Sequence, residues 1–206
     1  MGVIHKITQQ TRSRFLNLFE LEVTHKSGRD SKYYVASRAK CKEELKICTR
    51  KNKADGVVIF SVAKDENDGE RVVLIRQYRY PIDDYIYEFP AGLVDEGEEF
   101  HDAAVRELKE ETGLVLDPIP VETGYEKPYF TTIGMTDEAC ATVYGYATGK
   151  VSEKFQEDSE EIQVVLADKN EIRRILKEEN VAIMCSYMLM HYLHDEDAFG
   201  FLQRRK

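Results

Sequence analysis

The stretch that decides the fold is GLVDEGEEFHDAAVRELKEETGL, residues 92–114. Apolar residues recur at helical spacing through its second half, and they predict a helix from about His101 to Thr112. We expect Asp102 to cap the start of this helix and Gly113 to end it in a left-handed conformation. The stretch therefore predicts one amphipathic helix that follows an acidic loop.

The charges of this stretch gather on one side of the predicted helix. Glu107, Glu110 and Glu111 stand at positions i, i+3 and i+4, so they project from neighbouring turns onto the same side. Three carboxylates this close repel each other unless a cation lies among them, and hard oxygen ligands suit Mg2+ or Mn2+. Arg106 is placed to orient one of the glutamates, and Glu98 can reach back from the loop. The alternative is a solvated acidic face, which most glutamate-rich helices present.

The stretch also matches a known pattern, G-x5-E-x7-R-E-L-x-E-E-x-G-L, with every fixed position filled. This pattern resembles the signature box of the Nudix hydrolases, enzymes that cleave pyrophosphates linking a nucleoside to another group; residues 92–114 are called the box below. Upstream, Q-Y-R at residues 77–79 and E-F-P-A-G at residues 88–92 resemble the ADP-ribose pyrophosphatase branch. The resemblance implies an α/β fold, a Nudix α/β/α sandwich with a mixed β-sheet, over residues 51–206.

The resemblance assigns a metal site to the box. It implies that the carbonyl of Ala91 and the carboxylates of Glu107 and Glu111 hold Mg2+, or Mn2+ in its place, with Glu98 in support. Metal ions of this kind supply Lewis acidity, lower the pKa of water and orient a diphosphate. Metal dependence also removes a conflict with the acidic composition, because bound cations reverse the local charge and attract phosphate.

Catalysis further needs a group that takes a proton from the attacking water. In the branch that the chain resembles, this base comes from an acidic loop after the box, which corresponds here to residues 157–162. Asp158 and Glu160 are the two candidates, and the sequence does not separate them. Glu110 and Arg106 complete the predicted catalytic set, Glu110 by sharing the metal and Arg106 by orienting the glutamates.

Substrate contacts are predicted from the same resemblance and from the aromatic content. Arg79 matches the family arginine that contacts the substrate, and Arg76 and Glu138 are further candidates. The chain contains no Trp, so stacking on a base falls to Tyr or Phe. The candidates are Phe19, Tyr33 and Tyr34, from the N-terminal hairpin of a partner copy.

One segment departs from the branch pattern and leaves the substrate open. The branch commonly has a turn of the form S-P-G-x-S-D-E, whereas residues 132–138 read TIGMTDE, with Ile133 at the expected proline. The leading expectation is hydrolysis of ADP-ribose to AMP and ribose 5-phosphate. Alternatives are another nucleoside diphosphate sugar such as GDP-mannose, coenzyme A or an oxidised nucleotide, the last two being disfavoured by Q-Y-R and E-F-P-A-G. A non-catalytic ADP-ribose sensor is also an alternative, although such proteins usually lose box carboxylates.

The first fifty residues predict a separate antiparallel β-element. Residues 15–23 alternate as a strand, residues 27–30 form a turn, and residues 32–36 pair back on the strand. This hairpin has too few residues to bury a core alone, and we expect a second copy of the chain to cover it. The resemblance implies the same, because in that branch the N-terminal β-element swaps onto the partner subunit of a homodimer. Residues 39–55 are expected to be a linker.

Composition bounds the class of protein. The chain has 206 residues and a formal net charge of −9, which argues against nucleic acid or an anionic membrane as the main partner. No apolar run approaches the roughly 18 residues that cross a membrane, and residues 1–14 lack a signal-peptide core, so a cytoplasmic protein is expected. The four cysteines form no C-x-x-C pair and are expected to be reduced and mostly buried.

Overall fold

The computed structural model describes residues 1–65, 69–156, 161–195 and 197–202. Contacts between residues divide the chain into two units. The N-terminal unit comprises Met1–Asp55 and Pro128–Cys140, and the main unit comprises Gly56–Lys127 and Ala141–Lys206.

The N-terminal unit is built on a three-stranded antiparallel sheet. Its strands, in spatial order, are β1 (Val3–Gln9), β2 (Asn17–Thr24) and β3 (Asp30–Ser37). The predicted hairpin is confirmed, since β2 and β3 pair from Asn17 opposite Ser37 to Thr24 opposite Asp30. Strand β1 lies outside that hairpin, and its sequence VIHKITQ mixes polar and apolar residues too evenly to indicate a buried face.

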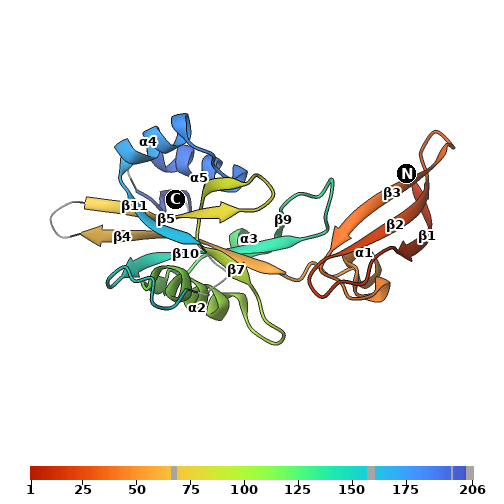
Figure 1. The fold of residues 1–206 in the computed structure, drawn as a ribbon, viewed down its shortest axis with the longest axis horizontal. Helices are drawn as coiled ribbons and strands as arrows, with labels where there is room; N and C mark the ends of the chain where they lie inside the picture. Colours follow the sequence, from red (N-terminus) through yellow and green to blue (C-terminus); the bar gives the residue numbers. More distant parts are fainter. Residues whose placement is uncertain (66–68, 157–160, 196, 203–206) are drawn as a thin grey trace. The chain divides into compact units, whose positions relative to one another are not determined.

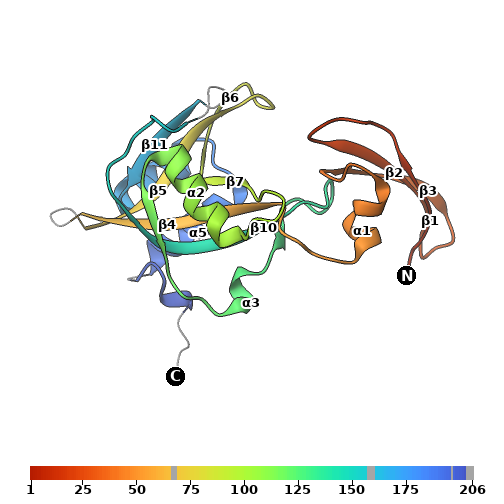
Figure 2. The same ribbon diagram turned by 90° about the horizontal axis from the view of Figure 1, so that it is seen from below.

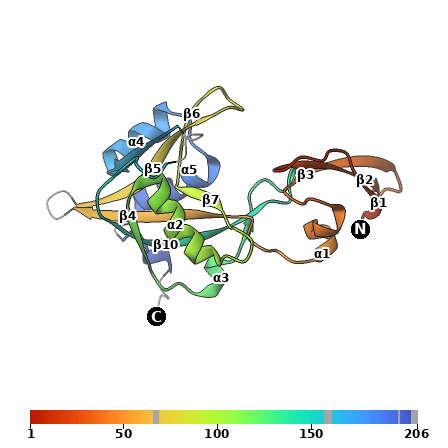
Figure 3. The ribbon, with the colours of Figure 1, turned by 60° about the horizontal axis from the view of Figure 1, so that its bottom comes forward.

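The expected linker, residues 39–55, is partly helical, so that prediction is wrong. It contains the 3-10 turn η1 (Lys42–Glu44) and the short helix α1 (Lys46–Thr49), beside one face of the small sheet (Figure 3). Leu45, between them, is only 2% exposed and lines an apolar groove together with Leu21 and Val35 of the sheet. Burial of one leucine therefore fixes a segment whose Lys and Glu content suggests a solvated chain.

A distant segment completes the N-terminal unit. Strand β9 (Tyr129–Phe130) pairs with Ala139 and Cys140 at the start of β10 (Ala139–Thr148). Between them, the backbone N–H of Ala36 donates to the carbonyl of Met135 at 2.9 Å, and the hydroxyl of Tyr33 donates to the carbonyl of Gly134 at 2.7 Å. Residues 128–140 thus extend the edge of strand β3.

The main unit contains a mixed sheet in which strand β4 (Gly56–Asp65) pairs with two different strands, β7 (Ala91–Leu93) and β5 (Gly69–Arg79), at successive places along its length. Its other strands are β6 (Asp84–Glu88), β8 (Val115–Pro118), β10 and β11 (Ile162–Ala167). The order is β11-β5-β4-β10-β8, with β6 on β5 and β7 on β4. Strand β4 pairs with β5 through residues 62–65 and with β7 through residues 56–58. The first residues of β4 therefore pair with β7, the strand that leads into the box.

Helices cover both faces of this sheet (Figure 1). Helix α2 (Phe100–Thr112) lies on one face, where Val57 and Ile59 of β4 belong to the core beneath it. Helices α4 (Lys169–Glu178) and α5 (Ile183–His194) lie on the other face, where Phe60 packs edge-on against Tyr192 of α5 with ring centroids 6.5 Å apart. Successive side chains of a strand point to opposite faces, so β4 serves both cores. The predicted α/β/α sandwich is confirmed.

Helix α2 has the predicted end and a different start. Glu99 occupies the N-cap position and its side chain makes no capping hydrogen bond. The prediction that Asp102 caps the helix is wrong, because Asp102 lies inside the first turn, where its charge still faces the positive end of the helix dipole. At the other end, Gly113 adopts φ 75° and its N–H donates to the carbonyl of Lys109 at 2.9 Å.

Helix α4 has a side-chain cap at its start. Asp168 caps α4, since Oδ1 accepts the N–H groups of Asn170 and Glu171 at 2.8 Å each. The short elements α3 (Thr123–Glu126) and η2 (Gly200–Leu202) complete the described structure. Within the described residues, no helix is both long enough and apolar enough to cross a membrane.

The cysteines differ in part from expectation. All four carry free thiols. Cys185 is buried, Cys41 and Cys140 are half-buried and Cys48 is exposed, so the prediction that most are buried is wrong. Burial raises the pKa of the Cys140 thiol to about 11, so this thiol is protonated at neutral pH.

Candidate active site

Strand β7 brings the start of the box against helix α2, which lies across the sheet in Figure 2. The backbone N–H of Ala91 donates to Oε2 of Glu111 at 3.1 Å, and Glu111 is only 2% exposed. The next residue, Gly92, lies so close to α2 that a Cβ atom there would overlap the carboxyl carbon of Glu107. The glycine that opens the box thus leaves the space that the Glu107 carboxylate occupies in this structure, so that strand and helix meet closely.

One arginine organises the other box carboxylates. Arg106 donates from Nε to Glu98 at 3.0 Å and from a terminal nitrogen to the same carboxylate at 2.9 Å. Its other terminal nitrogen donates to Glu107 at 2.7 Å and to Glu110 at 3.0 Å. The guanidinium also donates to the carbonyl of Leu93 at 3.0 Å. The predicted orienting role of Arg106 therefore has a geometric basis in three glutamates and one carbonyl.

Hydrogen bonds within this cluster shift the pKa values of its members. The hydrogen bond from Arg106, followed by that from the N–H of Asp95, holds the pKa of the Glu98 carboxyl below its usual range. The glutamates in turn raise the pKa of Arg106. Glu107 and Glu110 stand in the last two turns of α2, where the helix dipole is negative and carboxylates are disfavoured. Such a placement costs stability unless a cation joins the cluster.

The donor set suits a hard cation. A cavity of about 330 Å³ opens at this point, lined by Ala91, Gly92, Leu93, Asp95, Arg106, Glu107 and Glu110. Among the residues that the structure describes, no three His, Cys, Asp or Glu side chains are arranged as they would be around a bound metal ion. Carboxylate oxygens next to a backbone carbonyl are nevertheless the ligands that Mg2+ and Mn2+ prefer, so the residues fit the predicted metal.

Two predicted substrate contacts lie on strand β5 of the same unit. Arg79 donates from Nε to Glu88 of β6 at 2.7 Å. Arg76 places its guanidinium 4.1 Å from the centroid of the Tyr85 ring, also on β6. Arg76 further donates to Gln163 of β11 at 3.4 Å. The β5–β6 pair therefore orients both arginines, and Glu88 and Tyr85 are partners that sequence reasoning missed, although Glu88 opens the motif E-F-P-A-G.

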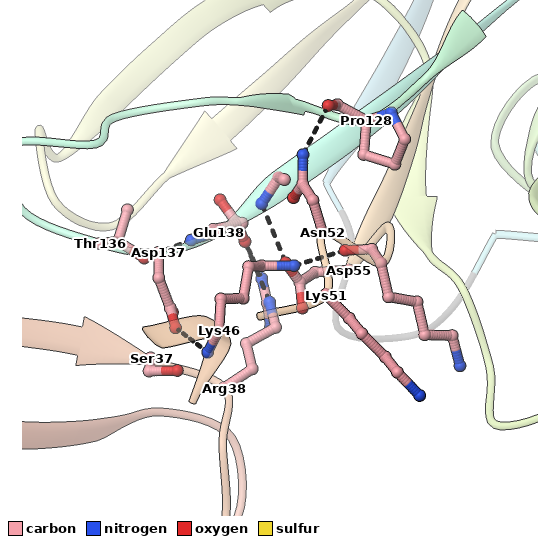
Figure 4. Close-up of polar contacts among 12 residues, drawn as sticks. Ser37, Arg38, Lys46, Lys51, Asn52, Asp55, Pro128, Thr136, Asp137 and Glu138 are labelled. Carbon is pink, nitrogen blue, oxygen red and sulfur yellow. Dashed lines mark hydrogen bonds and ion pairs between the residues drawn. The ribbon is translucent and has the colours of Figure 1, made fainter. Parts of the chain in front are cut away.

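The remaining substrate candidates lie in the N-terminal unit. Glu138 forms an ion pair with Arg38 at 2.8 Å (Figure 4). Tyr33 keeps 43% of its surface exposed. Phe19 is 0% exposed, so its ring belongs to the core of the small sheet and cannot stack on a base; the prediction for Phe19 is corrected. Alternation along β2 indicates that one face of the strand is buried, but does not say whether it is the face that carries Phe19.

The two candidates for the general base are not placed. Asp158 and Glu160 lie outside the described residues. The flanking residues are described: Gln156 precedes the segment, and the carbonyl of Glu161 after it accepts the N–H of Tyr78 at 3.1 Å.

Comparison with known proteins assigns the family. Residues 52–184 match the sequence profile of the NUDIX domain. The chain belongs to the Nudix domain family. The Nudix match contains the whole box, the Q-Y-R strand and both helix α2 and strand β7.

Relatives agree with this assignment over part of their length. An ADP-sugar pyrophosphatase of Mus musculus is 46% identical over 72 residues, 34% of this chain and 33% of that protein. An ADP-ribose pyrophosphatase of Saccharomyces cerevisiae is 36% identical over 85 residues, 39% of this chain and 36% of that protein. A Bacillus subtilis ADP-ribose pyrophosphatase is 30% identical over 114 residues, 55% of this chain and 58% of that protein. The matched regions thus span about a third to three fifths of these relatives.

A solved structure supports the fold. The crystal structure of an ADP compounds hydrolase superposes with a TM-score of 0.66 at 17% identity, covering 93% of this chain and 94% of the other. At this identity the likeness bears on the fold.

Proposed function

We propose that this protein is a Mg2+-dependent hydrolase of the pyrophosphate bond of a nucleoside diphosphate sugar, with ADP-ribose as the leading substrate. The observation that carries the proposal is the cluster of Glu98, Glu107 and Glu110, whose three carboxylates share the guanidinium of Arg106. The pyrophosphatase relatives from mouse, yeast and Bacillus support the substrate class. The products would be AMP and ribose 5-phosphate.

The residues that would hold the metal are Glu107, Glu111 and the carbonyl of Ala91, with Glu110 and Glu98 in support. Bound there, Mg2+ would supply Lewis acidity toward the diphosphate oxygens and lower the pKa of a water molecule. The N–H of Ala91 fixes the orientation of the Glu111 carboxylate. Arg106 fixes Glu98, Glu107 and Glu110, so the oxygen donors are ordered before substrate arrives.

The chain's own residues account for the rest of the reaction. Arg79 and Arg76 carry positive charge on β5, where an arginine offers five N–H donors to phosphate oxygens. Water forms a bond to one phosphorus while the bond from that phosphorus to the bridging oxygen breaks, and the bridging oxygen leaves with one product. A carboxylate takes the proton from the water. Asp158 and Glu160 remain the proposed bases, one of which would act.

The reaction can be tested with a panel of ADP-ribose, GDP-mannose, coenzyme A and 8-oxo-dGTP, each with Mg2+ and with excess EDTA. Hydrolysis would be followed by anion-exchange separation of each substrate from its nucleotide product. We expect turnover of ADP-ribose with Mg2+ and its loss in EDTA. Binding of ADP-ribose without turnover of any substrate would favour the sensor alternative and refute the hydrolase, and preference for GDP-mannose would revise the sugar.

We also propose that the active protein is a homodimer in which the N-terminal unit of one copy contributes to the substrate site of the other. The exposed aromatic rings of Tyr33 and Tyr34 support this proposal, because such rings on a small sheet are available to a second surface. Tyr33 and Glu138 would then contact the substrate from the partner copy. The compartment we propose is the cytoplasm.

Complementation between copies tests the shared site. Glu111→Gln disables the main unit and Tyr33→Ala alters the N-terminal unit, so each variant alone should be impaired. Co-expression would produce mixed dimers, and in each mixed dimer one of the two sites would combine an unaltered main unit with an unaltered N-terminal unit. Recovery of about a quarter or more of the wild-type rate is expected from this arithmetic; no recovery in dimers shown to be mixed would contradict a shared site.

A further inference from the structure

The C-terminal end of helix α2 is held by a segment from elsewhere in the chain. The last carbonyls of a helix have no donor within the helix, and in α2 two of these carbonyls belong to Glu111 and Thr112. The N–H of Ser152 donates to the carbonyl of Thr112 at 2.9 Å. The side-chain amide of Gln156 donates to the carbonyl of Glu111 at 2.8 Å. Residues 151–156 thus supply donors that the helix itself lacks.

The packing beside these hydrogen bonds is tight. A Cβ atom at Gly113 would lie 2.7 Å from Ser152, so the turn after the helix fits this segment closely. The ammonium of Lys109 lies 5.6 Å from the centroid of the Phe155 ring. Gln156 is half-buried and its own N–H donates to the carbonyl of Glu153 at 3.2 Å, which closes a turn that aims the side chain at α2.

Glu111 is therefore held at both ends. Its carboxylate accepts the N–H of Ala91 at 3.1 Å, and its carbonyl accepts the amide of Gln156 at 2.8 Å. A glutamine is a neutral donor, so it satisfies the carbonyl without placing another cation beside the carboxylates. Loss of this bond would remove one donor from a partly buried carbonyl and weaken the hold on the last turn of α2.

We propose that Gln156 is a positioning residue for the metal site: its amide fixes the backbone of Glu111 and with it the register of the carboxylate toward strand β7. The inference rests on the proposed metal-dependent function. Gln156 acts through Glu111 and is not itself assigned to contact metal or substrate. Groups that orient metal ligands commonly change metal affinity about 10- to 100-fold when removed, and a backbone contact belongs at the lower end of that range.

The test is Mn2+ binding to the full-length protein without substrate, followed by the electron paramagnetic resonance signal of free Mn2+. Gln156→Met keeps an unbranched side chain of similar length and removes the donor. We expect its dissociation constant for Mn2+ to rise about 10-fold. Gln156→Ala gives a second reading if the methionine variant does not fold. The thermal midpoint in EDTA is measured in parallel, because a purely structural role would lower the midpoint and leave the affinity of the folded protein unchanged.

Gln9→Leu is the matched control. Gln9 also donates its amide to a backbone carbonyl, that of Lys40, at 3.0 Å, but in the N-terminal unit. This variant should bind Mn2+ as the wild type does. Wild-type affinity in a folded Gln156→Met or Gln156→Ala variant would overturn the inference alone. Absence of Mn2+ binding by the wild-type protein would overturn the metal site itself, and the inference with it.

Discussion

Two charged clusters, one in each unit, use the same residue types and differ in how the charges are matched. In the N-terminal unit, Arg38 faces Glu138 at 2.8 Å and Lys46 faces Asp55 at 2.9 Å, so each acid has a cation of its own (Figure 4). In the box, three glutamates share the single guanidinium of Arg106. The first cluster joins segments that are distant in sequence, whereas the second carries an excess of acidic groups at the place where we propose a metal site.

The largest effect is expected at Glu111, the buried glutamate on the same helix as Glu107 and Glu110. Glu111→Gln should lower the rate of hydrolysis by about 1,000-fold or more, because a proposed metal ligand would be lost, and should leave the fold intact. Steady-state kinetics and circular dichroism measure the two quantities. Glu99→Gln is the control: Glu99 is exposed and its side chain makes no capping hydrogen bond. Wild-type turnover by Glu111→Gln would remove this residue from the site.

Replacing Arg106, the cation that three glutamates share, should make the thermal stability of the protein depend more strongly on bound metal. Arg106→Gln leaves the box glutamates without their guanidinium, and we expect the rate to fall about 10- to 100-fold as the ligands lose orientation. In EDTA the thermal midpoint should fall, and saturating Mg2+ should raise it by more than in the wild type, because a ligand stabilises the state that it binds. Arg173→Gln, on the exposed side of α4, serves as control. An equal Mg2+ shift in wild type and Arg106→Gln would contradict this account.

The cluster in the N-terminal unit should respond in stability rather than in turnover. Lys46→Met removes the pair with Asp55 and a hydrogen bond to the carbonyl of Lys53. Because the ammonium is mostly shielded from solvent, we expect the free energy of unfolding to fall by about 1–2 kcal/mol. Urea denaturation measures this loss. Turnover per folded molecule should stay within about two-fold of wild type, and a loss comparable to that of Glu111→Gln would show that this cluster also has a chemical role.

The smallest effect is a pH dependence traceable to Glu98. Its folded-state pKa lies below the ordinary value of 4.5, chiefly through Arg106. The ion pair therefore stabilises the fold fully above about pH 4.5, and that contribution is lost as pH falls through the lowered folded-state pKa. Glu98→Gln removes the contribution, so unfolding midpoints of wild type and variant, measured in EDTA, should differ at pH 7 and converge as the pH is lowered below about 4.5. A constant difference across this range would exclude Glu98 as the source.

The sequence predicts the box more fully than its surroundings, for a physical reason. Helix α2 is encoded by local periodicity and by the stop at Gly113, so its pattern is legible without any distant contact. The membership of residues 128–140 in the N-terminal unit depends on pairs such as Arg38 with Glu138, one hundred positions apart in the chain. Likewise, the burial of Leu45 and Phe19 follows from the partner elements on the sheet and not from composition.

The same distinction, between a local sequence pattern and a contact distant in sequence, applies to the site residues. The glutamates and Arg106 could be predicted because helical spacing brings them together. The hydrogen bond from Gln156 to Glu111 could not, since it joins residues 45 positions apart through one amide. Asp102 shows the converse limit: an acid near a helix start indicates the end of the helix that it favours, but not whether it is the cap or part of the first turn.

The close approach of Gly92 to Glu107 predicts a specific second-site suppressor. A methyl group at position 92 would overlap the carboxyl group of Glu107, so the two positions share one volume. Gly92→Ala should then displace the flexible end of the Glu107 side chain and lower turnover while leaving the fold intact, a defect that a second mutation can relieve. In a suppressor screen, Glu107→Asp is the change that withdraws the carboxylate by one methylene and makes room. Recovery of turnover in the double variant would assign the defect to space at position 92, whereas no recovery would show that position 107 needs the full glutamate side chain.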